Sequence, residues 1–181
     1  MKIDKIENEK DNHDIILYER LFKQYYHPLF LFAYRYVKNE ETAENIIHDV
    51  FLILWNERKK LNFALNIKTY LYNAVKNRCI DYLRRKKIEH KFEISHIVLD
   101  VESKTPETIL LHKELEYAIQ NALNDMPKKR REIFVMNRFD RLTYSEIASI
   151  LNISVKTVET QMSRSLKFLR KKLAAFILFL F

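Results

Sequence analysis

The 181-residue sequence contains no glycine, and this absence excludes several kinds of site. Phosphate-binding loops and the dinucleotide fingerprint both need glycine, because their backbone approaches a phosphate with no Cβ in the way. The single cysteine, Cys79, excludes an internal disulfide and any zinc site built from several cysteines. Cys79 falls within a helical pattern, which favours a small core residue over a reactive nucleophile.

Long apolar runs are also scarce. The first ten residues, MKIDKIENEK, are charged and hold no apolar signal region, so we expect a cytoplasmic protein. The chain ends in AAFILFLF, eight apolar residues where a membrane span takes about 20. We therefore expect no membrane span. We expect the apolar tail, residues 176–181, to pack on its own domain or on a partner.

Charge is plentiful but uneven. There are 32 basic and 24 acidic residues, which give a net charge of +8 and suggest a polyanionic partner. Residues 66–87 hold seven basic residues and one acidic one, whereas residues 88–107 hold five acidic and two basic ones. Hydrophobic periodicity fades over 88–107, so this stretch is predicted to be a flexible acidic linker. It would join two small domains, at 14–87 and 108–175.

Apolar residues recur at steps of three and four in both halves, which predicts an all-α fold. In the first domain we expect a helix from Asp14, a continuation from Pro28, and helices from about Asn39 and over 66–87. Residues 1–13 are polar and expected to be loose. The predicted buried residues of the last two helices are Ala43, Ile46, Ile47, Val50, Phe51, Leu54 and Trp55, then Ile67, Leu71, Ala74, Val75 and Tyr82. Arg78 falls on that same side, and the periodicity does not explain it.

In the second domain we expect a helix that starts at Thr105-Pro106-Glu107, then another after Pro127. The basic cluster Lys128, Lys129, Arg130 and Arg131 at the start of the latter could touch DNA backbone. A helix face that is simply exposed to water explains these residues nearly as well.

Residues 142–173 have the pattern of a helix-turn-helix. Thr143 and Glu146 form a T-x-x-E capping box, Asn152 suits a left-handed turn, and Ser154 can cap a second helix. A small Ala148 lets the helices approach, and Val158 closes the core under the turn. The predicted inward stripe of the second helix is Val155, Val158, Met162, Leu166, Leu169 and Leu173.

Polar side chains with a positive surplus lie off that stripe. Such a helix can read base edges in the major groove while its cations hold phosphates. The alternative is a solvated face on an ordinary helical hairpin. The candidate DNA-binding residues are Ser154, Lys156, Thr157, Glu159, Thr160, Ser163, Arg164 and Lys167.

The helix at 66–87 has a second polar face with amide, hydroxyl, aromatic and cationic groups. Such a face suits single-stranded nucleic acid, because cations track the backbone while rings and amides meet exposed bases. A solvated face is an equally good explanation from this helix alone. The residues concerned include Tyr70, Asn73, Lys76, Asn77 and Arg84.

Together the two halves resemble a sigma factor of the extracytoplasmic-function (ECF) group of the sigma-70 family, the short type with regions 2 and 4. AENIIHDVFLILW resembles the family's polymerase-binding helix, and IKTYLYNAVKNRCIDYLRRKK resembles its promoter-melting helix. MPKKRREIFVMNRFDRLTYSEIASILNISVKTVETQMSRSLKFLRKKL resembles the region that reads the −35 box. The three blocks stand in the family's order, with a linker between the domains.

The resemblance implies a subunit that directs core RNA polymerase to promoters and assists DNA melting, with no enzymatic activity, cofactor or metal. Its implied partners are promoter DNA, the largest-subunit clamp and the flap of the polymerase, and an anti-sigma factor. By resemblance, the polymerase-binding residues are Glu44, Asn45, His48 and Asp49, although Asn45 and His48 stand where the family more often has Asp and Gln. The −10 residues are Tyr70, Asn73, Lys76, Asn77, Asp81 and Arg84, and the −35 residues are the eight DNA-binding candidates named above.

Two other functions fit parts of the sequence. A stand-alone helix-turn-helix regulator would bind a palindromic duplex without polymerase. A metal-dependent nucleic-acid hydrolase would need clustered ligands, whereas the six histidines are scattered. His48 and Asp49 are a weak metal signal, because neighbours in a helix point about 100° apart.

Overall fold

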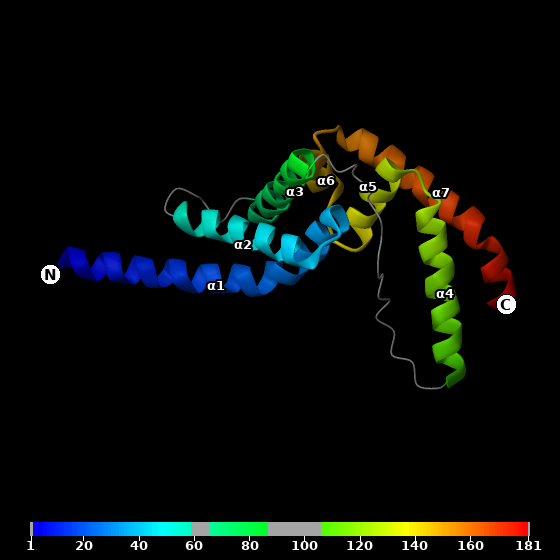
Figure 1. Cartoon of the computed structure of the whole chain (residues 1–181), viewed down its shortest axis with the longest axis horizontal. Helices are drawn as coiled ribbons and strands as arrows, with labels where there is room; N and C mark the ends of the chain where they lie inside the picture. The colour runs from blue at the N-terminus through cyan, green and yellow to red at the C-terminus, as the bar shows by residue number, and fades with distance from the viewer. Residues whose placement is uncertain (1, 59–65, 87–105, 181) are drawn as a thin grey trace. The chain divides into compact units, whose positions relative to one another are not determined.

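A computed structural model describes residues 2–58, 66–86 and 106–180, and the side chains of 14–58, 66–86 and 113–174. Within those ranges every regular element is an α-helix, and the chain divides into two compact units, Met1–Lys91 and Phe92–Phe181 (Figure 1). The predicted all-α architecture with two helical domains is confirmed. The predicted linker lies almost wholly outside the described residues.

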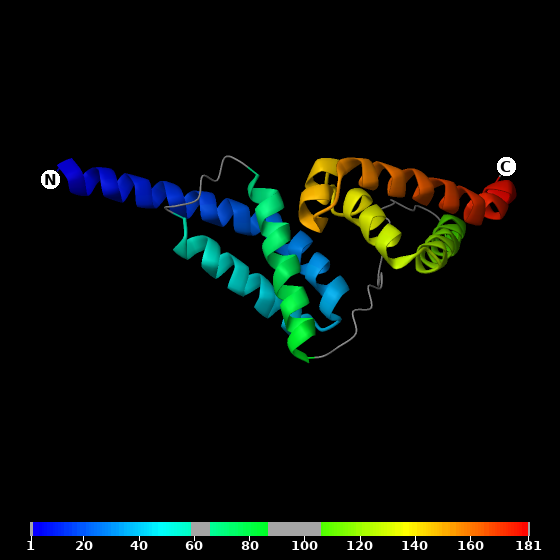
Figure 2. The ribbon, with the colours of Figure 1, turned by 90° about the horizontal axis from the view of Figure 1, so that it is seen from above.

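The first unit contains α1 (Lys2–Val37), α2 (Glu40–Asn56) and α3 (Ile67–Lys86), each of which contacts the other two. Figure 2 shows α3 crossing the pair formed by α1 and α2. The side chain of Asn39 caps α2 by accepting a hydrogen bond from the Thr42 amide at 2.8 Å. The residues predicted to form the buried side of α2 are all buried except Trp55, which is half-buried.

The start of α1 differs from the prediction. Residues 2–13, expected to be loose, are helical, and α1 runs on through Pro28 without a break in the assigned helix. Residues 2–13 include three lysines and two glutamates, which are good helix formers. A proline inside a helix costs about 3 kcal/mol. The fully buried Leu29, Phe32 and Ala33 offset this cost by packing the turn that follows Pro28.

The buried side of α3 is also displaced from the prediction. Leu71 and Val75 are buried as expected, but Ile67, Ala74 and Tyr82 are only half-buried. Tyr72, Cys79 and Leu83 are buried instead, because α3 packs on two helices at once. The Tyr72 ring lies 5.0 Å from that of Phe32, and Cys79 Sγ lies 4.0 Å from the Ala33 carbonyl. Cys79 is therefore a small core residue, as predicted.

The second unit contains α4 (Pro106–Asn124), α5 (Lys128–Arg138), α6 (Tyr144–Leu151) and α7 (Val155–Leu180). Helix α7 contacts all three others, and α5 and α6 lie along one side of its first half (Figure 2). An ion pair of 2.6 Å between Lys172 and Asp125 joins α7 to the end of α4. The predicted cap Thr105 and the side chains of the apolar tail lie outside the described residues. In the part of the chain that the structure describes, no helix combines the length and apolarity that a membrane crossing requires.

The inward stripe of α7 is only partly as predicted. Val158 and Met162 are buried and Leu169 and Leu173 are half-buried, whereas Val155 and Leu166 are each 42% exposed. Ser165 fills the third buried place, and its hydroxyl donates to the Gln161 carbonyl at 2.8 Å. The angle around the helix axis explains this exchange. Ser165, seven positions after Val158, points within about 20° of the same direction, whereas Leu166, eight positions after Val158, points about 80° away.

Candidate nucleic-acid interface

The helix-turn-helix forms through the local hydrogen bonds that its sequence predicts. The Thr143 amide donates to Glu146 Oε2 at 2.6 Å, and the Glu146 amide donates to Thr143 Oγ1 at 3.2 Å, which completes the capping box. Asn152 ends α6 in the left-handed conformation, with φ 53° and ψ 52°. Ala148 and Val158 are both buried. The turn and its core are therefore as predicted.

The first turn of α7 is held by its own hydroxyls. Ser154 Oγ accepts a hydrogen bond from the Thr157 amide at 3.1 Å and lies 2.8 Å from the Thr157 hydroxyl. The Thr160 hydroxyl donates to the Lys156 carbonyl at 2.8 Å. The whole predicted −35 set is exposed on this helix: Ser154, Lys156, Thr157, Glu159, Thr160, Ser163, Arg164 and Lys167.

The basic cluster at the start of α5 is divided between two roles. Arg131 is buried, and its Nη1 donates to Asn124 Oδ1 at 3.1 Å. Arg130 Nε donates to Gln161 Oε1 at 3.3 Å and so ties α5 to α7. Within this cluster only Lys128 and Lys129 are exposed. The expectation that all four residues could touch DNA backbone is therefore wrong for Arg130 and Arg131, which hold the domain together.

The outer side of α2 carries the predicted polymerase-binding residues. Glu44, Asn45, His48 and Asp49 are all exposed, opposite the buried side of the helix. The ring centroids of His48 and Tyr26 are 5.8 Å apart. Asp49 Oδ2 accepts a hydrogen bond from Arg78 Nη1 at 2.9 Å. This ion pair explains the position of Arg78, which the periodicity left unexplained.

The predicted −10 residues lie along α3: Tyr70, Asn73, Asn77, Asp81 and Arg84 recur at steps of three and four, and Lys76 precedes Asn77. Asn77, Asp81 and Arg84 are exposed, and Arg84 Nη1 lies 3.4 Å from Asp81 Oδ1. The others, Tyr70, Asn73 and Lys76, are half-buried. Burial raises the pKa of the Tyr70 phenol, and the negative charge of Glu57 raises it further, so Tyr70 stays a neutral hydrogen-bonding aromatic.

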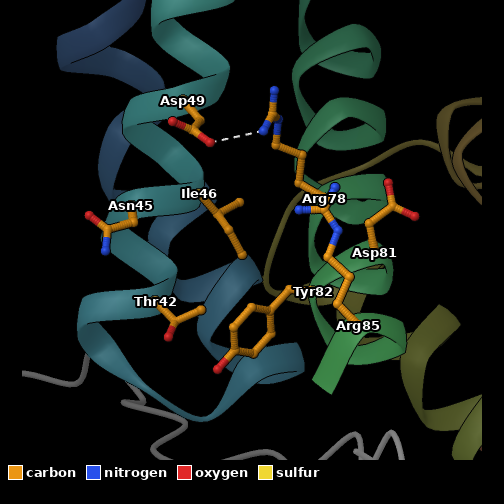
Figure 3. Close-up of a pocket in the computed structure, with 8 residues that line it drawn as sticks. All are labelled: Thr42, Asn45, Ile46, Asp49, Arg78, Asp81, Tyr82 and Arg85. Atoms are coloured by element: carbon orange, nitrogen blue, oxygen red, sulfur yellow. Dashed lines mark hydrogen bonds and ion pairs between the residues drawn. The ribbon is translucent and has the colours of Figure 1, made fainter. Parts of the chain in front are cut away.

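A cleft of about 520 Å³ separates the outer edges of α2 and α3. The Asp49–Arg78 ion pair spans it, and Tyr82 projects from α3 toward α2 at its other end (Figure 3). Sequence reasoning missed Arg78, Tyr82 and Arg85 as lining residues, because only the packing of α2 against α3 brings them to the cleft. The full lining is Thr42, Asn45, Ile46 and Asp49 from α2, and Arg78, Asp81, Tyr82 and Arg85 from α3.

The cleft thus brings together members of two predicted sets. Asn45 and Asp49 belong to the polymerase set, and Asp81 belongs to the −10 set. Among the described residues, no group of three histidine, cysteine, aspartate or glutamate side chains is arranged to hold a metal ion.

Comparison with known proteins identifies the family. Residues 21–88 match the model of sigma-70 region 2, and residues 116–169 match the model of sigma-70 region 4. The chain is 30% identical over 160 residues to the ECF RNA polymerase sigma factor SigW of Bacillus subtilis (strain 168), with 82% of this chain and 84% of SigW covered. This chain belongs to the ECF sigma factors. It therefore directs RNA polymerase to promoters, and the stand-alone regulator is not favoured.

Further matches agree with this assignment. The ferric citrate uptake sigma factor FecI of Escherichia coli (strain K12) is 24% identical, with 84% of this chain and 88% of FecI covered. The sigma factor RpoE of Bartonella quintana, solved with the anti-sigma factor NepR, has the same fold, with a TM-score of 0.60 at 16% identity. That match covers 86% of this chain and 96% of RpoE. CnrH, solved with the cytosolic domain of CnrY, matches with a TM-score of 0.57 at 19% identity, over 87% of this chain and 88% of CnrH.

Proposed function

We propose that this sigma factor works through one face on each of three helices. The outer side of α2, with Glu44, Asn45, His48 and Asp49, binds the clamp of the largest polymerase subunit. The outer side of α3, with Tyr70, Asn73, Lys76, Asn77, Asp81 and Arg84, holds unpaired −10 bases. The exposed side of α7 enters the major groove at −35, while its domain rests on the flap. The protein itself does no chemistry and acts in the cytoplasm together with polymerase.

The observation that carries this proposal is the exposure of the polar side of α7 on a completed helix-turn-helix. All eight residues proposed for the −35 contact are open to solvent, while Val158 and Met162 fix the opposite side of the helix in the core. A recognition helix needs this division, because its base-reading side chains must be free while its rear side is held rigidly. Lys156, Arg164 and Lys167 supply the charge that phosphates attract.

The α3 face has the chemistry needed to hold melted bases. Opening DNA without ATP requires that unpaired bases be bound well enough to offset lost stacking, a few kcal/mol per step by analogy with flipped bases. Tyr70 offers a neutral ring for stacking, Asn73 and Asn77 offer amides to base edges, and Arg84 offers a cation. One small domain could hardly supply that free energy alone. Tethering to polymerase lets the −10 and −35 contacts act together.

An anti-sigma factor is a further proposed partner. RpoE was solved in complex with the anti-sigma factor NepR, and this chain shares its fold. We infer that a protein of that class holds this sigma factor inactive until a signal releases it. Co-purification of the full chain from its own cells, compared before and after addition of core polymerase, tests this. An anti-sigma factor should be lost when core is added.

Reconstituted transcription tests the proposed function as a whole. Core polymerase and the full chain are incubated with genomic DNA fragments, and the 5′ ends of the transcripts are sequenced. We expect new start sites that share one −35 and one −10 element, absent with core alone. No new start site would contradict the proposal. A gel shift without core is the second arm, since tight binding of a palindromic duplex there would support a stand-alone regulator.

A further inference from the structure

Val155 is an apolar residue that its own domain covers only in part. It is 42% exposed at the first position of α7, although its spacing had suggested a place in the core. We propose that Val155 reads the methyl group of a thymine in the −35 element. This inference rests on the proposed function of α7 and adds one specific base contact to it.

The position of Val155 follows from the turn before it. The left-handed Asn152 and the Ser154 cap set where α7 begins, so Val155 lies in its first turn. Val158, three residues later, is fully buried, whereas Glu159, four residues later, is exposed. Residues four apart share one edge of a helix, so Val155 lies on the edge of Glu159. Met162, seven residues later, is buried, so Val155 stands at the boundary between the buried side of α7 and the proposed DNA-reading side.

The chemistry of the first turns of α7 points to a methyl group. From Ser154 to Thr160, Val155 is the one exposed apolar side chain, since Val158 is buried and the other residues are polar. The first turns of a recognition helix are the part that reaches base edges in the major groove. Among the four bases only thymine presents a methyl group there, and apolar side chains recognise it. Val155 would lose its exposure to water on contact with that methyl group.

Leu166 provides a matched control on the same helix. It is also 42% exposed, so truncating it removes apolar surface of similar accessibility. It lies 11 residues after Val155 in the sequence, about 16 Å farther along the axis at 1.5 Å per residue. We therefore expect Leu166 to lie beyond the turns that reach base edges.

The test combines one protein change with one DNA change. Holoenzyme made from core polymerase and the full chain is bound, by equilibrium competition, to promoters in which single −35 thymines are replaced by deoxyuridine, which lacks the methyl group. For the wild type, one position should lower affinity about fourfold, the factor for about 0.8 kcal/mol of one buried methyl group. Holoenzyme with Val155→Ala should bind the unmodified promoter about fourfold more weakly than the wild type does. Its affinity should not fall further when the sensitive thymine is replaced by deoxyuridine. Holoenzyme with Leu166→Ala should still lose affinity about fourfold when that thymine is replaced by deoxyuridine.

Two results would overturn the assignment of Val155. One is a wild-type affinity that no deoxyuridine changes, and the other is a Val155→Ala variant that keeps the full loss at the sensitive position. Either result counts only if wild-type holoenzyme is first shown to start transcription on the unmodified promoter. Failure of that start would instead refute the proposed function, so the two failures are distinguishable. Circular dichroism and urea unfolding of Val155→Ala check its fold, which should be intact because the side chain is not buried.

Discussion

Replacing Asp49 with alanine is expected to weaken binding to core polymerase far more than replacing Arg78, the residue to which it is paired. Asp49 Oδ2 and Arg78 Nη1 are 2.9 Å apart, so loss of either side chain breaks the same ion pair. The two variants differ in what remains. Arg78→Ala leaves the Asp49 carboxylate available to polymerase, whereas Asp49→Ala removes it.

The structure bounds the size of each effect. The two side chains are 40% and 57% exposed, so the pair belongs to the surface class that contributes about 0.2–1 kcal/mol. Arg78→Ala should therefore lower the free energy of unfolding by no more than about 1 kcal/mol, and should weaken polymerase binding less than about fivefold. Loss of a charged hydrogen bond to polymerase costs about 1.5–3 kcal/mol. Asp49→Ala should therefore raise the Kd for core about 10- to 150-fold.

The assay is equilibrium binding of the fluorescently labelled full chain to core polymerase, with urea unfolding of each variant measured in parallel. Arg85→Ala is the matched control, because it removes a guanidinium group from the same cleft without touching the ion pair. The reasoning is refuted if Arg78→Ala and Asp49→Ala raise the Kd equally and the double variant raises it no further. Asp49 would then act only by bracing α2 against α3.

Three further changes probe other parts of the account. Thr143→Ala breaks the capping box and should lower the free energy of unfolding of the second unit by about 1 kcal/mol in urea titrations, whereas an unchanged value would show that the cap is dispensable. Lys167→Ala should weaken binding evenly across promoters and reduce the salt slope by about one, while Arg164→Ala should relax −35 selectivity; the opposite pattern would exchange their roles. Burial raises the pKa of the Cys79 thiol from 9.0 to about 12, so the folded state keeps a proton that the unfolded state loses. Stability should fall as pH rises from 9 through about 12, and urea titrations of Cys79→Ala should lack that part of the fall.

Features that depend on one or two turns of chain were predictable from the sequence. The capping box of Thr143 and Glu146, the left-handed Asn152 and the buried side of α2 all rest on side chains three or four positions apart. Periodicity reports such relations directly, because it measures angles around a single helix. The exposed sides of α2, α3 and α7 follow for the same reason, and the roles of their residues remain proposals.

Features that depend on packing between helices were not predictable. The Asp49–Arg78 pair joins residues 29 positions apart, so no local pattern contains it. On α7, Ser165 is buried and Leu166 is exposed, because the three helices that pack against α7 cover the side that carries Ser165. Val155, at the first position of α7, is likewise left 42% exposed. Where hydrophobicity and packing disagree, packing decides the burial, and the displaced apolar residue becomes available for a contact outside the domain.

The measurement that tests the central claim most directly is site-specific photo-cross-linking within the assembled promoter complex. A photoreactive residue is placed in turn at Asn45, Asn77 and Thr160, which are exposed on α2, α3 and α7. The account predicts that position 45 cross-links to the largest polymerase subunit, position 77 to the unpaired −10 bases, and position 160 to the −35 duplex. Cross-links from position 77 to protein alone, or from position 160 to the −10 region, would contradict it.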